Sequence, residues 1–459
     1  MKNFFRRFST RLWIWYHQLR PVYALMTGYA VYVLIAFVLL SLPICWEVSD
    51  VPLIDTLFTA VATVSTSGLQ TVNFAETYNI LGQIVVLIGI QISGLGYMTL
   101  GSLFVFASTR HLSRNRIKIG QAVLAMPESF EPLRFLRHIA IFTLSIELIG
   151  ALILWICFSA AGVPNPLWAA VFHSVAAFCT AGISIFPSNL EAFADNAPVT
   201  LTMSLLCLLG GIGFIVMEDV YQSIKHKTVQ ITLTTKVILV ATFGAVLLGT
   251  LFLFCDPNLT EFSLKQRFLM AFFQTVSALT TSGFNTMPVS NLASATLVIV
   301  IVLMLLGPSP SGTGGGLKNT TWATAIAALL SFFRSRQEIT FFNYTVPHYR
   351  TTTAFAAITL YVMTFVIGTY CLLLCNSHPF EQVVFESASA LGTVGLSHGI
   401  TSELCTMGKV IIMVLMYIGR LGILSLALGA IALYHDISHD KGIHHVEDEP
   451  PIKEDDIML

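Results

Sequence analysis

The chain has 459 residues, of which 55% are hydrophobic and 11% charged, with a formal net charge of -1. Soluble domains carry about 25% charged residues, so this composition excludes an ordinary soluble protein and predicts a surface that mostly meets lipid. It also excludes the basic surface that nucleic-acid binding requires. The eight cysteines are scattered without metal-ligand spacing and are expected to be small buried apolar residues.

The first predicted spanning segment follows a basic N-terminus. Residues 1–20 contain five Lys and Arg side chains, and the apolar stretch that follows ends without a small-residue cleavage site. We therefore expect the first helix, near 24–44, to remain as a membrane anchor rather than to be removed as a signal peptide.

Long uncharged runs recur along the rest of the chain. A helix needs about 20 mostly apolar residues to cross a bilayer. One uncharged run, 268–317, is 50 residues long and must fold back on itself. Eight spanning segments are predicted, the sixth of them broken, near 24–44, 79–107, 139–161, 198–221, 237–255, 293–333, 352–374 and 409–434.

Basic residues are unevenly placed around these segments. If both termini share one side with the loops 108–138, 222–236 and 334–350, that side holds nineteen Lys and Arg residues and the other holds three. Basic residues favour the cytoplasmic side of a membrane, so both termini are expected in the cytoplasm.

A stretch of twelve residues lies between the members of each helix pair, and it repeats four times. Each copy is too short to cross the hydrocarbon, which predicts a re-entrant segment. Phenylalanine and small residues in the first eight columns are explained by helix packing as readily as by function. The copies read LFTAVATVSTSG (57–68), VFHSVAAFCTAG (171–182), FFQTVSALTTSG (272–283) and VFESASALGTVG (384–395).

The end of each copy carries a functional signal. Packing gives no reason for a helix breaker at one fixed place, whereas glycine allows backbone conformations that aim carbonyl groups inward. Four such strands can replace the hydration shell of a cation. The identical residues, at which we expect the cation to bind, are Thr66 and Gly68, Thr180 and Gly182, Thr281 and Gly283, and Thr393 and Gly395.

The second helix of the third pair is interrupted by GPSPSGTGGG (307–316), with five glycines and two prolines. No α-helix continues through this composition. A surface loop is an alternative, but the apolar run resumes beyond it. A phosphate-binding loop would need Lys directly after the glycine, whereas Leu317 separates Gly316 from Lys318. The remaining interpretation is a flexible plug within the membrane.

Arg420 and Glu147 are charged residues inside predicted helices. Arg420 lies about midway along the last span, where a charge facing lipid costs at least about 2.5–3.5 kcal/mol, so it is expected to face the pore. Glu147, in the third span, is interpreted as a snorkelling or interhelical polar contact in preference to an ion-binding group.

Five stretches together resemble the Trk/Ktr/HKT superfamily of potassium transporters, most closely the Ktr membrane subunit. They are GQIVVLIGIQISGLGYMTLGS (82–102), TTSGFNTMPVSNL (280–292), LLGPSPSGTGGGLKNTT (305–321), SALGTVGLSHGIT (389–401) and GKVIIMVLMYIGRLGILSLALG (408–429). The resemblance implies an all-α membrane protein with four membrane-pore-membrane repeats around one central pore, which comprise eight spanning helices and four re-entrant pore segments. The expected parts are a cytoplasmic N-terminus (1–20), repeat 1 (21–110), a cytoplasmic loop (111–138), repeats 2 to 4 (139–224, 236–334, 350–434) and a cytoplasmic tail (435–459).

The resemblance also assigns roles to particular residues. The four glycines match the potassium-selective pattern, and sodium-selective relatives carry serine where this chain has Gly68. The selectivity filter is expected at Val64, Ser65, Thr66, Ser67, Gly68, Phe178, Cys179, Thr180, Ala181, Gly182, Leu279, Thr280, Thr281, Ser282, Gly283, Leu391, Gly392, Thr393, Val394 and Gly395. The gate is expected at Gly307, Pro308, Ser309, Ser311, Gly312, Thr313, Gly314, Gly315, Gly316, Lys318 and Arg420.

The function implied is potassium uptake by a homodimer in the bacterial inner membrane, with sodium dependence or symport expected. A cytosolic ring of nucleotide-binding subunits is the expected regulator, with loop 108–138 and the tail as docking surfaces. No cofactor is expected beyond potassium in the filter, with sodium as a further candidate ion. A sodium-selective or non-selective transporter and an alternating-access carrier remain alternatives. No enzyme is expected, because His173 stands alone in its pore segment.

Overall fold

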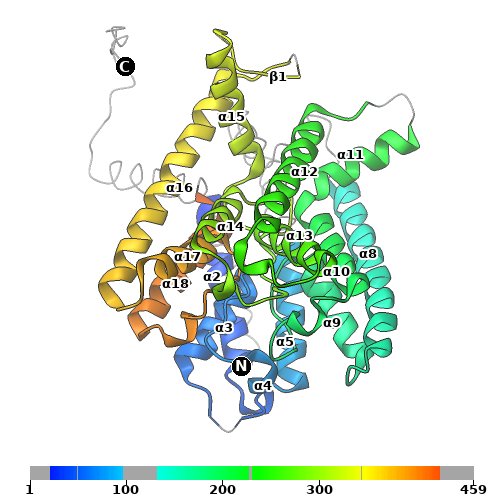
Figure 1. Ribbon diagram of the computed structural model, residues 1–459, viewed down its shortest axis with the longest axis vertical. Helices are drawn as coiled ribbons and strands as arrows, with labels where there is room; N and C mark the ends of the chain where they lie inside the picture. The colour runs from blue at the N-terminus through cyan, green and yellow to red at the C-terminus, as the bar shows by residue number, and fades with distance from the viewer. Residues whose placement is uncertain are drawn as a thin grey trace, which may run out of the picture.

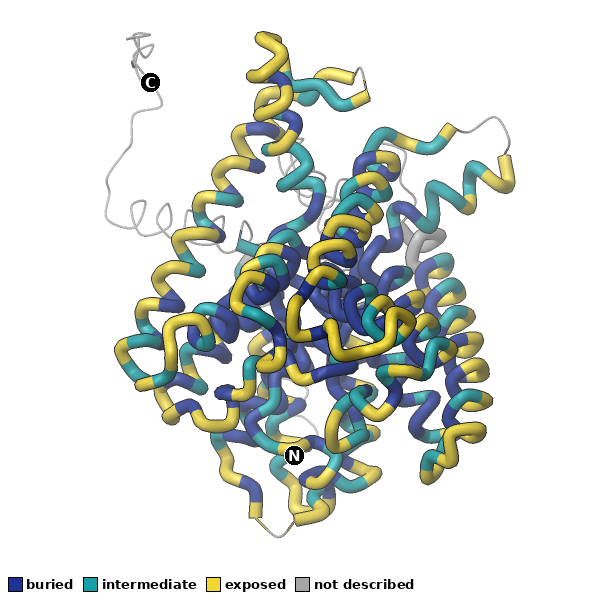
Figure 2. The backbone as a smooth tube through the Cα atoms, viewed as in Figure 1, coloured by how far each residue is buried: buried dark blue, intermediate teal, exposed yellow. Residues whose placement is uncertain are grey.

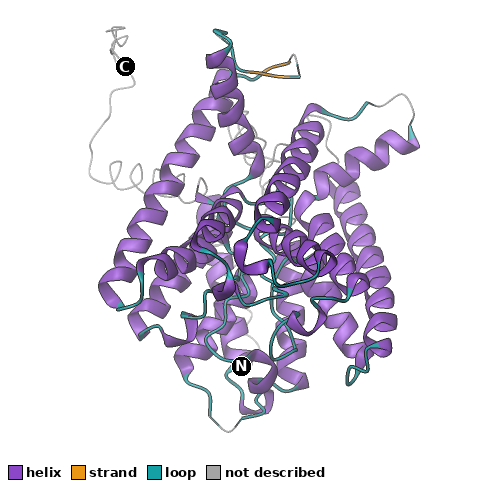
Figure 3. Ribbon diagram, viewed as in Figure 1, coloured by secondary structure: helices purple, strands orange, loops and turns teal. Residues whose placement is uncertain are grey.

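The computed structural model describes residues 21–48, 50–96, 132–226, 230–336, 338–342 and 344–423. This part of the chain is almost entirely helical, as Figures 1 and 3 show. Its two strands, β1 (Thr340–Phe341) and β2 (Tyr344–Thr345), form a small antiparallel hairpin at one end. Buried residues gather in the middle of the molecule, and exposed residues cover the outward faces of the long helices (Figure 2). The predicted helical fold class is confirmed.

Three helices among the described residues are long and apolar enough to cross a membrane on their own. They coincide with three of the eight predicted spans. Their outward faces expose large apolar side chains such as Leu144 and Leu247, as expected for surfaces that meet lipid. The three helices are α8 (Pro132–Ala160), α12 (Leu233–Phe254) and α16 (His348–Cys375).

Four other predicted spans begin with shorter helices. These helices are α2 (Pro21–Leu40), α5 (Ile80–Gln91), α14 (Ser294–Leu306) and α18 (Thr406–Leu421). The expected continuations of α5 and α18, at 97–107 and 424–434, lie outside the described residues. After α14 the chain leaves the helical conformation until α15 (Asn319–Phe333) begins, so the predicted interruption is confirmed.

The prediction of one continuous span at 198–221 is wrong. Helix α10 (Ala197–Ile212) ends at Gly213, and α11 (Phe214–Lys225) leaves it at an angle of 91°. Gly213 has φ +92°, a conformation that side chains disfavour and glycine tolerates. Helix α11 therefore packs against α8 and α12 instead of extending α10 (Figure 1). A single glycine thus bends what hydropathy alone presents as one run.

Each of the four repeated stretches forms one short helix. Proline stands at or just before the start of three of them, where its fixed φ suits the first helical turn. The phenylalanine shared by all four copies is fully buried or nearly so in each. The helices are α3 (Leu53–Ser65), α9 (Pro166–Phe178), α13 (Leu264–Thr280) and α17 (Phe380–Gly392).

The first and last helix pairs meet at a seam between α3 and α18. The Nζ atom of Lys409 on α18 lies 2.6 Å from Oδ1 of Asp55 on α3, and the two side chains are only 12% and 9% exposed. Nearby, the Tyr417 hydroxyl donates to the Met26 carbonyl at 2.9 Å. Removing one partner of such a buried ion pair leaves an uncompensated charge, which is costly.

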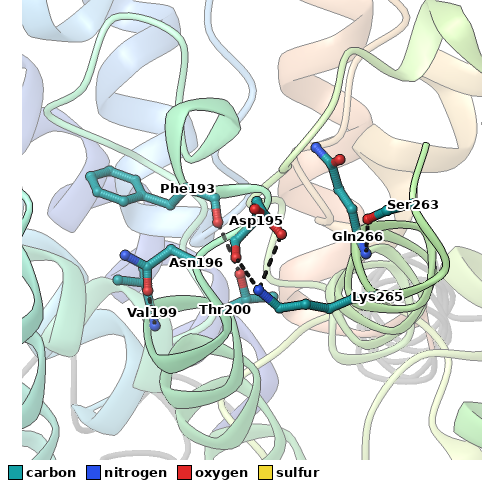
Figure 4. Close-up of polar contacts among 8 residues, drawn as sticks. All are labelled: Phe193, Asp195, Asn196, Val199, Thr200, Ser263, Lys265 and Gln266. Atoms are coloured by element: carbon teal, nitrogen blue, oxygen red, sulfur yellow. Dashed lines mark hydrogen bonds and ion pairs between the residues drawn. The ribbon is translucent and has the colours of Figure 1, made fainter. Parts of the chain in front are cut away.

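A second contact joins the starts of α10 and α13 (Figure 4). The Nζ atom of Lys265 lies 3.2 Å from Oδ1 of Asp195 and donates to the Asp195 carbonyl at the same distance. Asn196 and Ser263 cap the two helices, because their side-chain oxygens accept backbone N–H bonds from the first turn. The ion pair is exposed and contributes little by itself, so the caps fix the two helix starts.

Candidate functional site

One or two residues after the end of every short helix stands a threonine in the left-handed region, which β-branched residues rarely adopt. Backbone strain of this kind is typical of functional sites. Two residues later, the glycine has positive φ in all four copies. The threonines are Thr66, Thr180, Thr281 and Thr393, with φ of 50°, 51°, 56° and 51°, and the glycines are Gly68, Gly182, Gly283 and Gly395, with φ of 78°, 63°, 76° and 96°.

The four glycines approach one another in a closed series. A Cβ atom on Gly68 would lie 2.9 Å from Cα of Gly182, and one on Gly182 would lie 3.0 Å from Cα of Gly283. The series continues from Gly283 to Cα of Gly395 at 3.0 Å and returns from Gly395 to Cα of Gly68 at 3.1 Å. The strands therefore pack too closely for any side chain, which explains why glycine occupies all four positions.

Three of the four threonine hydroxyls, those of Thr180, Thr281 and Thr393, face a Gly-rich loop, defined here as residues 307–316. The Oγ1 atoms of Thr281 and Thr393 are buried and have no hydrogen-bond partner in the described part of the chain. A Cβ atom on Gly314 or Gly315 would collide with these two oxygens. A buried oxygen without a partner is a place where a cation supplies the missing interaction.

The Gly-rich loop also bonds the ends of the short segments directly. The Thr313 hydroxyl donates to the Phe178 carbonyl at 3.0 Å and lies 3.1 Å from the Thr180 hydroxyl. The Gly316 N–H donates to the Gly419 carbonyl of α18 at 3.2 Å. The loop therefore lies directly against the ends of the second, third and fourth short helices.

The bend between α10 and α11 supplies a second set of bonds to the Gly-rich loop. The Ser309 N–H donates to the Gly211 carbonyl at 3.0 Å, and the Phe214 N–H donates to the Ser311 carbonyl at 3.2 Å. The Ser311 hydroxyl accepts from the Ile215 N–H at 3.1 Å. A helix break frees backbone donors and acceptors, and here the loop uses them.

Arg420 lies against the loop as its buried position predicted. Its side chain is 5% exposed and donates to the Thr313 carbonyl and, at 2.7 Å, to the Ser93 carbonyl. The hydroxyls of Ser309 and Ser311 bond to the α10–α11 bend and not to Arg420. Sequence reasoning missed Ser93, although the glycines of ISGLG (92–96) inside an apolar run were a signal of irregular backbone.

A π-helical turn, η2 (Ile92–Gly96), places Ser93. Such turns inside α-helices are frequent at functional sites, because they free backbone groups. While the Ser93 carbonyl accepts from Arg420, the Ser93 hydroxyl donates to the Val64 carbonyl. One residue of the first helix pair thus contacts both the first filter segment and the arginine.

Lys318 brings a second positive charge to the same place. Its Nζ atom donates to the Gly314 carbonyl at 2.8 Å and to the Gly315 carbonyl at 3.4 Å. Lys318 and Arg420 thus bind carbonyls of three consecutive residues, because Arg420 takes that of Thr313. Like charges repel strongly where water is scarce, so a passing cation would be opposed here.

Glu147 makes the interhelical contact that its position suggested. It is 5% exposed and accepts from the Gln91 amide of α5 at 3.1 Å. The Cys179 thiol of the second short segment lies 3.7 Å from Oε1 of Gln91 and 3.9 Å from Oε1 of Glu147. This polar cluster therefore stands behind the second segment and joins it to α5 and α8.

Comparison with known proteins identifies the chain from its sequence. The family model TrkH, described as a cation transport protein, matches residues 24–439. The chain belongs to the TrkH family. This confirms the expected membership of the Trk/Ktr group of cation transporters.

Curated members of the TrkH family cover most of the chain. The Ktr system potassium uptake protein B of Bacillus subtilis is 33% identical over 408 residues, covering 88% of this chain and 91% of the relative. Its namesake in Vibrio alginolyticus is 33% identical, with 85% and 87% covered. The potassium/sodium uptake protein NtpJ of Enterococcus hirae is 31% identical, with 89% and 92% covered.

A solved TrkH-family structure shares the fold. The crystal structure of the potassium transporter TrkH from Vibrio parahaemolyticus superposes with a TM-score of 0.70 at 19% sequence identity. The match covers 88% of this chain and 84% of that one. The helical transporter fold therefore extends over nearly the whole chain.

Proposed function

We propose that this TrkH-family chain takes up potassium through a pore lined by its four Thr-x-Gly segments. The observation that carries the proposal is the closed series of glycines, in which four strands with the same backbone surround one axis. Carbonyl rings of this kind can replace the hydration shell of a potassium ion. The uptake functions in the names of the relatives agree with this proposal.

The filter proposed here is formed by the last five residues of each short segment. Potassium would bind at the paired threonines and glycines, and the unpartnered Oγ1 atoms of Thr281 and Thr393 would be part of the innermost site. Gly68 adds no side chain to the ring, which favours potassium over sodium. One relative is named for uptake of both potassium and sodium, so a pore that selects less strongly between these two ions is the alternative.

The gate proposed here is the Gly-rich loop together with Lys318 and Arg420. The loop would close the pathway sterically, since it touches the filter threonines from below. The two side-chain charges would add an electrostatic barrier to cations. Opening would require the loop to leave the α10–α11 bend and Arg420 to release the Thr313 carbonyl.

Assembly and orientation belong to the same proposal. Two relatives are named as components of Ktr systems, which supports a partner subunit for this chain. We propose a homodimer in the cell membrane, with both termini in the cytoplasm on the charge count, regulated by a cytosolic ring of nucleotide-binding subunits. Of the candidate docking segments, loop 108–138 lies outside the described residues up to position 131, and the tail 435–459 lies outside them entirely.

The deciding experiment is potassium uptake into a bacterial strain that lacks its own uptake systems. Uptake is measured with and without sodium, and with and without a co-expressed regulatory subunit. We expect growth at low potassium, uptake stimulated by both additions, and competition by rubidium stronger than by sodium. Sodium uptake without potassium preference would favour the alternative, and no cation uptake at normal membrane levels would contradict the proposal.

A further inference from the structure

The third column of the four short segments is polar in every copy but chemically different in each. The four side chains are all buried, with at most 7% of the surface exposed, and they are Thr59, His173, Gln274 and Glu386. Eleven positions later, two residues beyond each filter glycine, stand Gln70, Ser184, Asn285 and Ser397. The equal spacing would allow each third-column side chain to bond the residue eleven positions later. Only the second and fourth segments make this bond.

The fourth segment is held by Glu386, which is fully buried. Its Oε1 atom accepts from the Ser397 hydroxyl at 2.6 Å and from the His398 N–H at 3.0 Å. Its Oε2 atom accepts from the Thr401 hydroxyl at 2.8 Å. All three donors lie on the stretch that follows Gly395. The carboxylate therefore fastens the outer end of this strand to its own short helix.

The second segment is held in the same way by His173. Its Nδ1 atom lies 2.8 Å from the Ala169 carbonyl, which can only accept, so Nδ1 carries a proton. Its Nε2 atom lies 2.8 Å from the Ser184 hydroxyl, which donates to it in the neutral ring. The Ser184 oxygen in turn accepts from the Phe186 N–H at 3.0 Å. Here too, the serine two residues after the glycine is bonded to the third column.

The first and third segments are arranged differently. Both amide atoms of Gln274 are without a hydrogen-bond partner in the described ranges, while Asn285 donates to Oε1 of Glu191 at 2.9 Å. The Thr59 hydroxyl donates to the Asp55 carbonyl within its own helix at 2.9 Å. In these two copies the third-column side chain does not bond the residue two positions beyond the glycine, although the Ser277 hydroxyl of the third segment donates to the Phe284 carbonyl at 2.6 Å.

We propose that His173 and Glu386 are positioning residues that fix two opposite strands of the filter more firmly than the other two. We call each bond between the third column and the following serine a latch. The glycine series runs from strand 1 through 2 and 3 to 4 and back to 1, so the latched strands 2 and 4 face each other diagonally. The inference rests on the proposed function, because it concerns ion discrimination by that filter.

The latches matter because a filter discriminates only while its carbonyls keep their number and spacing around the ion. Strands free on every side would close around the smaller sodium ion as readily as around potassium. Two fixed strands on one diagonal hold a minimum opening. Loss of a latch should therefore lower the ratio of potassium to sodium uptake while the pore still conducts.

The test compares the same substitution at equivalent positions of a latched and an unlatched strand. Potassium and sodium uptake are measured per molecule of protein in the membrane. Glu386→Leu should lower the potassium-to-sodium uptake ratio by about tenfold, since it removes the acceptor of three hydrogen bonds. Glu386→Gln, which keeps an acceptor, should stay within about threefold of wild type. Gln274→Leu should leave the ratio unchanged within about twofold, since it removes no bond.

The serines provide the second arm, which uses small changes that disturb packing least. Ser397→Ala and Ser184→Ala should each lower the ratio several-fold, and Ser397→Ala combined with Glu386→Gln should cost less than the two effects summed. Equal effects of Glu386→Leu and Gln274→Leu, or unchanged ratios in both serine variants, would overturn the inference. If the latch variants are unchanged while Gly68→Ser lowers the ratio, the inference fails and the proposed function stands. If wild type transports no potassium, the proposed function itself fails.

Discussion

The four short segments and the four helices that follow them behave in opposite ways. Each short segment ends with the same left-handed threonine and the same positive-φ glycine. The following helices leave the regular conformation at one comparable place, but each does so differently. They show a π turn at Ile92–Gly96, a bend at Gly213, the interruption after Leu306 and a break at Gly422, where φ is +80°.

The difference reflects what each region must do. A ring around an ion needs the same contribution from every side, so the segments stay alike. A gate needs a single obstacle, here the Gly-rich loop of the third pair. The corresponding helices of the other three pairs hold that loop in place. Ser93 from the first pair, Gly211 from the second and Arg420 from the fourth all bond the loop or its arginine. We therefore expect substitutions in the segments to change selectivity and substitutions at the breaks to change regulation.

Gly68→Ser tests the uniform region and should have the largest effect. A Cβ atom there would lie 2.5 Å from the Ala181 carbonyl oxygen and 2.9 Å from Cα of Gly182, and φ is +78°. We expect the potassium-to-sodium uptake ratio to fall by about tenfold or more at a normal membrane level. Gly244→Ser, where a Cβ atom meets nothing within 4 Å, is the control. An unchanged ratio would remove Gly68 from the filter.

Shortening the loop by deleting Thr313 to Gly315, or replacing Arg420 by Gln, tests the obstacle. Both changes remove bonds that hold the loop beneath the filter, so we expect several-fold higher cation flux and weaker dependence on the regulatory subunit. Flux is measured in vesicles with equal protein content. Loss of flux in both variants would mean that these residues build the pathway, and unchanged flux in both would place them away from it.

Gly213→Ala tests the α10–α11 bend, which supports the Gly-rich loop, rather than the loop itself. Alanine at φ +92° and ψ 160°, a region open almost only to glycine, is strained by about 1–3 kcal/mol, and its Cβ atom would lie 2.6 Å from the Ser311 hydroxyl oxygen. We expect flux without the regulatory subunit to rise about twofold while the uptake ratio stays unchanged. Gly244→Ala serves as the control. A changed uptake ratio would show that the two regions are not separable.

Glu191→Gln changes a residue of η4 (Glu191–Phe193), outside the four short segments, and should have the smallest effect. Burial raises the pKa of the Glu191 carboxyl above its ordinary value, and the Asn285 hydrogen bond partly opposes this. A raised pKa means that the folded state binds the proton more tightly, so wild-type stability falls as pH rises through that pKa. Glutamine removes this loss and keeps an acceptor for Asn285. We expect the variant to unfold about 1–2 °C higher than wild type at pH 7 and equally at pH 4, measured by thermal unfolding in detergent. A lower unfolding temperature at pH 7 would contradict this reading.

The sequence predicts features that depend on residue type and misses those that depend on backbone atoms. The threonines and glycines of the segments, the interrupted helix and buried Arg420 all appear as unusual residues at repeated or apolar places. Ser93 accepts from Arg420 at 2.7 Å through its carbonyl, which every residue possesses, so the residue type does not predict this contact and only the glycines of ISGLG (92–96) point to irregular backbone there. The sequence does not reveal the bend at Gly213, because hydropathy reports how apolar a stretch is and not the direction in which its helix runs. The latches differ between copies that look equivalent, because spacing does not decide which neighbours compete for Asn285.

The seam between α3 and α18 gives the ring one joint of a different kind. Consecutive segments are tied by the chain itself, but the fourth meets the first only through packing and contacts such as Lys409 with Asp55. The chain itself therefore does not close the ring. Consecutive segments are connected through long stretches of intervening chain, whereas no stretch of chain connects the fourth segment directly to the first. Separation of the fourth segment from the first is therefore opposed by non-covalent contacts alone, and these include a buried ion pair at the start of α3, a helix length away from the glycine series.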